Sequence, residues 1–171
     1  MVEAERKEGK PEDQDDIESG KVVLVADTVN AIITALWTIL TGDPDLKTLC
    51  GGTVRCYFPM AASSPDFPYL NHDLDPGIVP AQWSIVDADY SLDIWEYSPT
   101  ATSTLAIRDQ IITLLDQREI TTASGEIIGG RLALVNGGFI DTDQEHVRHY
   151  AMAWTLRYAR KAEIGNIVGR G

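Results

Sequence analysis

The alternation of apolar and polar residues is clearest between Val86 and Trp95. Every second residue in this segment is apolar, and the residues between them are polar except for the last. The apolar set is Val86, Ala88, Tyr90, Leu92 and Ile94, and the intervening set is Asp87, Asp89, Ser91, Asp93 and Trp95. A period of two is typical of a β-strand with one face buried and the other in water. The pattern therefore predicts a long strand that turns one face toward a core.

A turn and an amphipathic helix are predicted directly after this strand. Pro99 has no backbone N–H for a strand ladder, so the strand should end near Ser98. Either Thr102 or Ser103 could cap the helix that follows. Its apolar residues recur at helical spacing: Leu105, Ile107, Ile111, Leu114 and Leu115. Because the strand face needs cover and the helix has an apolar stripe to bury, we expect this helix to pack on the sheet.

A second helix is predicted nearer the start of the chain. It should begin with Asp27 as its cap and end at Gly42, a residue type that suits a helix C-terminus. A short helical turn should follow from Asp43-Pro44, because Pro is favoured at a first helical position. Leu46 and Leu49 are expected to face inward from that turn.

Further strands are predicted where β-branched and aromatic residues run between Gly, Pro or Asn. The expected segments are residues 53–58, 69–74, 126–135 and 147–158, with a bulge at Gly129-Gly130 and a turn at 136–138. One face of the last strand should carry its large residues: Tyr150, Met152, Trp154, Leu156 and Tyr158. The predicted fold class is therefore α+β, a mainly antiparallel sheet packed against two helices. One domain is expected, over residues 21–160.

The two ends of the chain differ from this body in composition. Residues 1–20 contain eight acidic and three basic side chains and almost nothing apolar. Such a segment cannot bury enough surface to offset its chain entropy, so we predict a disordered acidic arm. The arm either stays solvated or orders against a neighbouring subunit, where Arg157, Arg160 and Lys161 could receive it. Residues 161–171 are predicted to be a flexible, Gly-containing tail.

The overall charge narrows the possible partners. With 26 acidic and 14 basic residues the net charge is −12, which argues against general binding to a phosphate backbone. No apolar run approaches the roughly 20 residues of a membrane span, so we expect no membrane partner. Cys50 and Cys56 are expected to be reduced thiols rather than a disulfide.

Candidate chemistry is sparse. Three aspartates share one strand face: Asp87, Asp89 and Asp93. They could bind a divalent cation or act as the paired acids of a hydrolase. The alternative is that they simply form the solvent-exposed face of an amphipathic strand. His146 and His149 lie three residues apart, which on a strand places them on opposite faces, and no further ligands complete a metal site. No nucleophile motif or phosphate-binding glycine loop occurs. The sequence therefore predicts a binding or structural protein without catalytic residues, metal or cofactor.

Several segments in a fixed order resemble a known family. They are Ala31–Leu36, Asp45–Leu49, Val54–Pro59, Phe67–Leu70, Leu92–Trp95, Leu105–Ile111 and, after Asp141-Thr142-Asp143, His146–Tyr150. Their order and spacing are similar to those of the tail terminator (tail-completion) family of long-tailed bacteriophages, over about residues 28–160.

The resemblance implies a structural protein of the virion tail or neck, assembled in the host cytoplasm. Members of the family form a ring, usually hexameric, on the head-proximal end of the tail tube, where the ring ends tube polymerisation and offers a surface for head joining. The implied partners are other copies of the chain, the tail tube protein and a head-completion or connector protein. Genomic DNA would pass through the lumen without specific binding. The family supplies no catalytic residues and no cofactor.

A ring of this kind needs contact surfaces. Met60 and Phe67 are unusually apolar for the expected loop 59–68, and Trp95 and Tyr97 end the central strand. We predict that these four residues contact a neighbouring subunit or the tube, with the core of the subunit as the alternative location. The remaining interface candidates are Arg157 and Arg160, and the candidate lumen or wet face is formed by Asp87, Asp89 and Asp93. Alternative functions are another neck or head-completion ring protein, or a small metal-dependent hydrolase that uses the three Asp residues.

Overall fold

The computed structural model describes residues 15–61, 63, 65–76, 85–123, 125, 127–144 and 146–160. Within these ranges, the side chains of residues 15–27, 128, 139–144 and 160 are outside the description. The helices are α1 (Asp15–Gly42), α2 (Pro44–Leu49) and α3 (Thr102–Leu115). The strands are β1 (Arg55–Tyr57), β2 (Tyr69–Asp75), β3 (Ile85–Tyr97), β4 (Glu119–Ile120), β5 (Ile127–Gln144) and β6 (Val147–Arg160).

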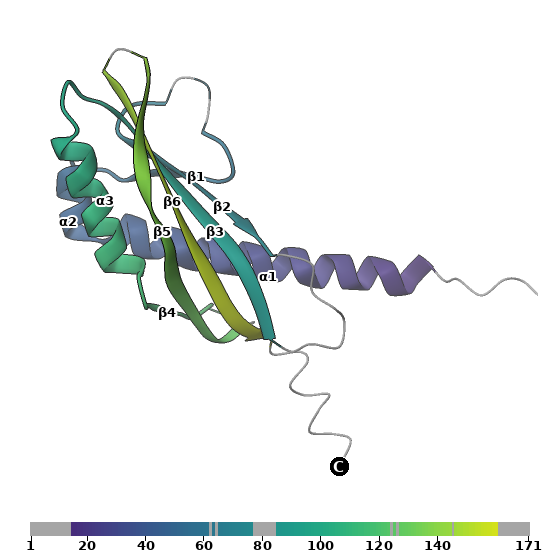
Figure 1. Ribbon diagram of the computed structural model, residues 1–171. Helices are drawn as coiled ribbons and strands as arrows, with labels where there is room; N and C mark the ends of the chain where they lie inside the picture. The colour runs from purple at the N-terminus through teal and green to yellow at the C-terminus, as the bar shows by residue number, and fades with distance from the viewer. Residues whose placement is uncertain are drawn as a thin grey trace, which may run out of the picture.

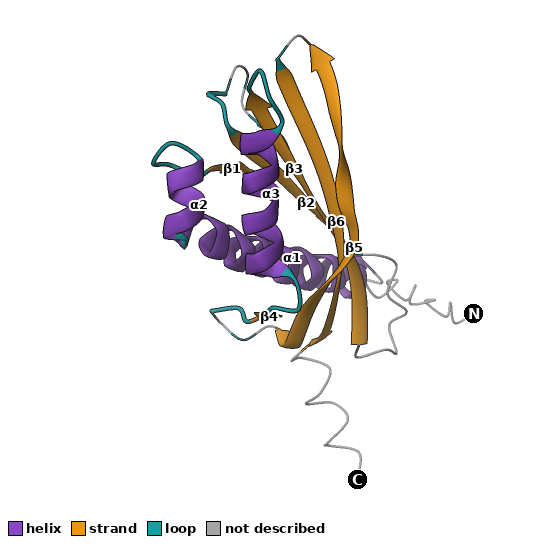
Figure 2. Cartoon of the chain, turned by 60° about the vertical axis from the view of Figure 1, so that its left-hand side comes forward, coloured by secondary structure: helices purple, strands orange, loops and turns teal. Residues whose placement is uncertain are grey.

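One sheet organises the molecule. Its strand order is β1-β2-β3-β6-β5-β4, and every neighbouring pair is antiparallel except β1 with β2 (Figure 1). Figure 2 shows α2, α3 and the C-terminal half of α1 on one side of this sheet. We call this side the covered face and the other side the open face. The α+β class and the mainly antiparallel sheet are thus confirmed, and no helix in the described ranges is long and apolar enough to cross a membrane.

The core lies between the covered face and the helices. Residues of β3 alternate between the two faces as predicted, and the apolar set from Val86 to Ile94 is almost completely buried. The predicted large residues of β6 are buried beside them. Helix α3 supplies Ile107, Ile111 and Leu115, each 0% exposed. Burying a side chain of this size typically contributes about 1.5–3 kcal/mol, so this layer dominates the stability of the fold.

The start of α3 is stabilised differently from the sequence prediction. Neither Thr102 nor Ser103 is the cap: the N-cap residue is Ala101, which offers no side-chain acceptor. Instead, Glu96 of β3 is buried on the covered face and accepts a hydrogen bond from Thr104 Oγ1 in the first turn of α3. A carboxylate at the positive end of a helix is favourable, so this tertiary contact stabilises a first turn that has no side-chain cap.

Helix α1 begins earlier than predicted. It starts at Asp15 and not at Asp27, so residues 15–20 of the predicted arm belong to a helix, while residues 1–14 lie outside the description. The predicted tail 161–171 also lies outside it. The C-terminal side matches the prediction: α1 ends at Gly42, and Asp43 Oδ1 accepts a hydrogen bond from Leu46 N at 2.7 Å. The inward position of Leu49 was wrong, because that side chain is 39% exposed while Leu46 is buried.

The glycines of β5 form bulges within one long strand. The register with β6 shifts between Ile128 and Arg131, which confirms the predicted bulge at Gly129-Gly130. The predicted turn at 136–138 was wrong, because these residues stay within β5 at two further register shifts. Gly138 has φ +86°, and a Cβ there would lie 2.1 Å from Ala151 O. Only glycine fits this close approach to β6, so the residue marks a bulge and not a strand end.

Candidate functional site

The open face carries a group of aromatic side chains at one end. We call them the aromatic cluster: Tyr57, Phe67, Tyr69, Trp95, Tyr97 and His149. They come from β1, β2, β3 and β6 and from the residues just before β2. The pleat explains their shared side, because alternate residues of each strand point away from the helices. The fold thus gathers rings that are far apart in the sequence.

Three rings of the cluster form a stacked row across the sheet. Tyr69, Trp95 and His149 lie opposite one another in register on β2, β3 and β6. The ring centroids of Trp95 and His149 are 4.0 Å apart with an interplanar angle of 9°, and those of Tyr69 and Trp95 are 6.2 Å apart with the same angle. Phe67 lies beside this row, 5.4 Å from Tyr69 and 6.4 Å from Tyr97 between centroids. Such contacts hold the rings in fixed positions on the face.

Three of the four apolar and aromatic interface candidates are exposed, and the fourth is half-buried. Tyr97 is 60% exposed, Phe67 41% and Met60 80%, and Trp95 is half-buried. Met60, Phe67 and Tyr97 therefore do not fill the subunit core, whereas the half-buried Trp95 has a buried indole nitrogen. The structure brings Phe67, Trp95 and Tyr97 into one cluster, and it places no ring contact on Met60 among the described residues.

Sequence reasoning missed half of the cluster. Tyr57 and Tyr69 carried no local signal, because only the pairing of β1, β2 and β3 places them near Trp95. His149 was considered only as a metal ligand. In the structure it stacks on Trp95, and its Nε2 lies 3.2 Å from Asp93 Oδ1, an ion-pair distance when the ring is protonated.

The three aspartates lie on the open face but do not converge. Asp87 accepts two hydrogen bonds from Arg157 of β6, from Nε at 2.7 Å and from Nη2 at 2.8 Å, and these bonds lower the pKa of Asp87. Asp93 lies beside His149, and Asp89 is exposed. Within the described ranges, no three His, Cys, Asp or Glu side chains are placed to hold a metal ion. Arg157 is thus already partnered, and Arg160 is the last residue of β6.

The titratable groups in and near the core have little chemical reactivity at neutral pH. His72 is 2% exposed, with its Nδ1 3.3 Å from Tyr90 Oη, and burial lowers the pKa of His72 to about 4. Cys50 and Cys56 are free, as predicted. Burial raises their pKa values to about 11 and about 12, so both remain protonated thiols with little nucleophilic character at neutral pH.

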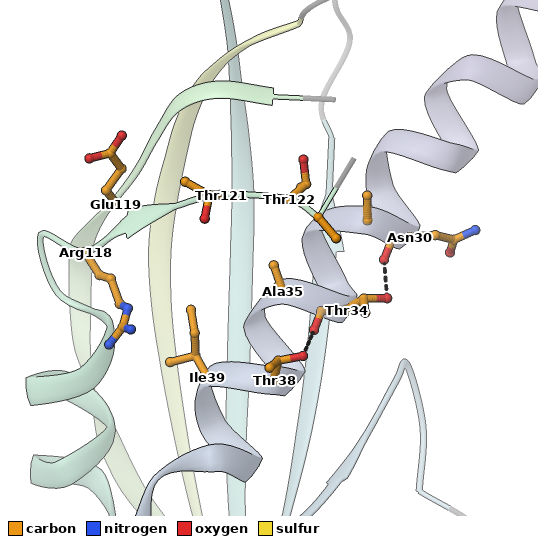
Figure 3. Close-up of a pocket in the computed structure, with 11 residues that line it drawn as sticks. Asn30, Thr34, Ala35, Thr38, Ile39, Arg118, Glu119, Thr121 and Thr122 are labelled. Atoms are coloured by element: carbon orange, nitrogen blue, oxygen red, sulfur yellow. Dashed lines mark hydrogen bonds between the residues drawn. The ribbon is translucent and has the colours of Figure 1, made fainter. Parts of the chain in front are cut away.

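A groove that the sequence did not predict lies between α1 and the segment that contains β4. It encloses about 570 Å³ (Figure 3). Its lining consists of Asn30, Ala31, Thr34, Ala35, Thr38, Ile39, Arg118, Glu119, Thr121, Thr122 and Ala123. Most of these side chains are small and lack charge, and Arg118 and Glu119 provide the charged end. This lining suits a packing contact better than catalysis.

Comparison with known proteins gives a likeness in fold. No protein-family model and no curated protein matches the sequence. One similar solved chain belongs to a structure described as the virion of a native gene transfer agent (GTA) particle. The two chains superpose with a TM-score of 0.60 at 15% sequence identity, over 76% of this chain and 96% of the other. At this identity the likeness establishes a shared fold.

Proposed function

We propose that this chain is a structural protein of a virion and that it forms a ring, hexameric in the simplest case, on the head-proximal end of a tail tube. The ring would end tube polymerisation and offer the surface for head joining. Two findings of different kinds support the proposal. The order of sequence motifs resembles the tail terminator family, and a chain from a gene transfer agent virion has the same fold over 96% of its own length.

The observation that carries the proposal is the aromatic cluster on the open face. Tyr and Trp are enriched at the centres of protein interfaces, because they supply a large contact area with few rotatable bonds. Here such rings are held in fixed positions on a face that the helices leave uncovered. We therefore assign Phe67, Trp95 and Tyr97, with Met60 nearby in sequence, to the contact with a neighbouring subunit or the tube.

The sheet edges fit a protein that adds once and does not propagate. The outer strands, β1 and β4, have three and two residues. Very short edge strands are one way in which sheets limit further strand pairing, although β4 covers only residues 130 and 131 of the long strand β5. A terminator needs this property, because it must bind the last ring of the tube without templating another.

The other end of the open face carries charge. Asp87 and Asp89 lie on β3 away from the aromatic cluster, and the chain as a whole has a net charge of −12. An acidic surface repels DNA phosphates. We assign Asp87 and Asp89 to the lumen, where DNA would pass without binding. Asp93 lies nearer the aromatic cluster, beside His149.

Two variants on one strand test the proposal. Tyr97 and Ile85 lie at opposite ends of β3, on the same face, with 60% and 57% of their surfaces exposed. We expect Tyr97→Asp to leave the melting temperature unchanged but to abolish ring formation or tube capping, because a charge would enter the contact. Ile85→Asp should leave the melting temperature, ring formation and tube capping unchanged. Light scattering gives the mass of the assembly, and negative-stain images with purified tail tubes show capping.

Three other results would contradict parts of the proposal. Rings and capped tubes with Tyr97→Asp and with Phe67→Asp would remove the aromatic cluster from the interface. A wild-type monomer that is indifferent to tubes would contradict the terminator role. Rings that bind head connectors but ignore tubes would identify another neck or head-completion protein.

A further inference from the structure

Helix α1 is longer than the body it covers. Its 28 residues correspond to a length of about 42 Å. Residues 32, 36 and 40, in the C-terminal half, are completely buried in the core. Figure 1 shows the N-terminal half continuing past the sheet. We call residues 15–27 of α1 the projecting half.

The composition of the projecting half is unusual for a helix that leaves the body of a protein. It contains five successive apolar residues, Val22 to Ala26. Five successive residues cover the whole circumference of a helix, and a helix that is apolar all round is normally buried. We therefore expect this apolar stretch to pack against another protein surface.

The groove between α1 and the β4 segment has the size and lining to receive such a partner. A helix about 10 Å across occupies roughly 400 Å³ per turn, so a groove of about 570 Å³ accommodates one turn. Ala31, Ala35 and the threonines of α1 form a wall of small side chains, which lets another helix approach closely. The hydroxyls of Thr34 and Thr38 already donate to Asn30 O and Thr34 O at 2.8 Å, so they need no further acceptor (Figure 3).

The groove cannot be filled by the projecting half of its own chain. Residues 30–39 of α1 form one wall of the groove, and the projecting half continues the same helix away from that wall. A second copy of the chain is free of this constraint. The charged end of the groove carries one basic and one acidic side chain, Arg118 and Glu119, so the fit rests on the small, uncharged wall and not on charge.

We infer that the projecting half of α1 docks, through Val22 to Val25, in the α1–β4 groove of a neighbouring copy. The two surfaces involved differ, so the contact is head-to-tail and, when repeated around an axis, closes into a ring. This inference rests on the proposed ring and names the contact that builds it. It leaves the aromatic cluster for the tube or for a second contact within the ring.

Cross-linking between full-length copies that each carry one added cysteine tests the inference. A Leu24→Cys copy is mixed with a Thr34→Cys copy, and thiols are oxidised with copper phenanthroline. Because each copy carries one partner only, a Leu24–Thr34 disulfide can form only between copies. We expect a dimer band for this mixture, since a disulfide forms when two Cα atoms come within about 7 Å. Cys50 and Cys56, with burial and raised pKa values, should react slowly.

The control is a Leu24→Cys copy mixed with a Trp37→Cys copy. Trp37 also lies on α1 and is 47% exposed, but it does not line the groove. Equal cross-linking in both mixtures would overturn the inference. Absence of cross-links while wild-type rings form would overturn it and leave the ring intact. Absence of both cross-links and rings would overturn the inference and the proposed function together.

Discussion

Two tryptophans on neighbouring strands illustrate how differently the two faces of the sheet are used. Trp154 of β6 lies on the covered face, is 1% exposed and packs 5.7 Å from Tyr90 between ring centroids. Trp95 of β3 lies on the open face, is half-buried and stacks between Tyr69 and His149. The first is surrounded by core residues from helices and strands, and the second only by other rings of the same surface.

The contrast between the two tryptophans shows that folding requires apolar residues on the covered face but not on the open face. The covered face must be apolar, because α1 and α3 pack on it. The open face could be entirely polar, as Asp87, Asp89 and Ser91 on the same strand demonstrate. Burial in the core does not require aromatic residues at Trp95 and Tyr97, which is consistent with the proposed contact with another molecule.

The largest expected effect comes from truncating the two tryptophans. Trp154→Ala should lower the free energy of unfolding by about 3–5 kcal/mol, because it leaves a cavity in the core. Trp95→Ala should cost about 1 kcal/mol, since it removes ring stacking from a surface. Urea denaturation measures both. Equal losses would show that the open face belongs to the folding core, and the comparison would fail.

The next effect concerns a buried base on the covered face. The pKa of His72 is lowered to about 4 by burial, against 6.5 for an ordinary histidine. The unfolded chain therefore binds a proton below pH 6.5 that the folded chain does not bind until about pH 4. Stability from this group is complete above pH 6.5 and decreases as the pH falls toward 4, by roughly 3 kcal/mol at most.

A glutamine at this position should remove that pH dependence. The difference in unfolding free energy between the wild type and His72→Gln should be larger at pH 7.5 than at pH 5, because only the wild type loses stability as its histidine is protonated on unfolding. Urea midpoints at the two pH values measure the difference. If the difference stays constant, His72 is not the neutral buried base that its surroundings indicate.

Local periodicity was sufficient for much of the fold. The face of β3, the face of β6 and the stripe of α3 followed from spacings of two and of three to four residues, because these elements bury one side against a single core. The incorrect predictions concern segments whose structure depends on residues far away in the sequence. Asn136, Gly137 and Gly138 resemble a turn until β6 is paired with them, and the first turn of α3, which has no side-chain cap, is contacted by Glu96 from β3.

The candidate site was predictable only in part for the same reason. Trp95 and Tyr97 were visible as aromatic residues that break the polar side of an alternation. Tyr69 and His149 join them through the register of β2, β3 and β6, which links residues 26 and 54 positions from Trp95. No local pattern contains that information. The groove beside α1 likewise depends on how a helix and a two-residue strand meet.

The smallest effect is expected at the acidic end of the open face. The triple variant Asp87→Asn, Asp89→Asn and Asp93→Asn should leave the melting temperature and the ring nearly unchanged. The pair of Asp87 with Arg157 is exposed, where water and salt screen the attraction, so its loss should be difficult to detect. Asp89 is exposed and Asp93 half-buried, and removing their charges from an acidic protein also relieves repulsion.

Calorimetry with Mg²⁺ and Mn²⁺ completes this last test, because it addresses the metal-dependent alternative directly. The carboxylates of Asp87 and Asp93 are directed to different neighbours, Arg157 and His149, so we expect no stoichiometric binding by the wild type. Tight binding that the triple variant abolishes would assign chemistry to this end of β3. A triple variant that forms intact rings but yields non-functional tails would show that the charges themselves matter, as expected if they line the path of the DNA.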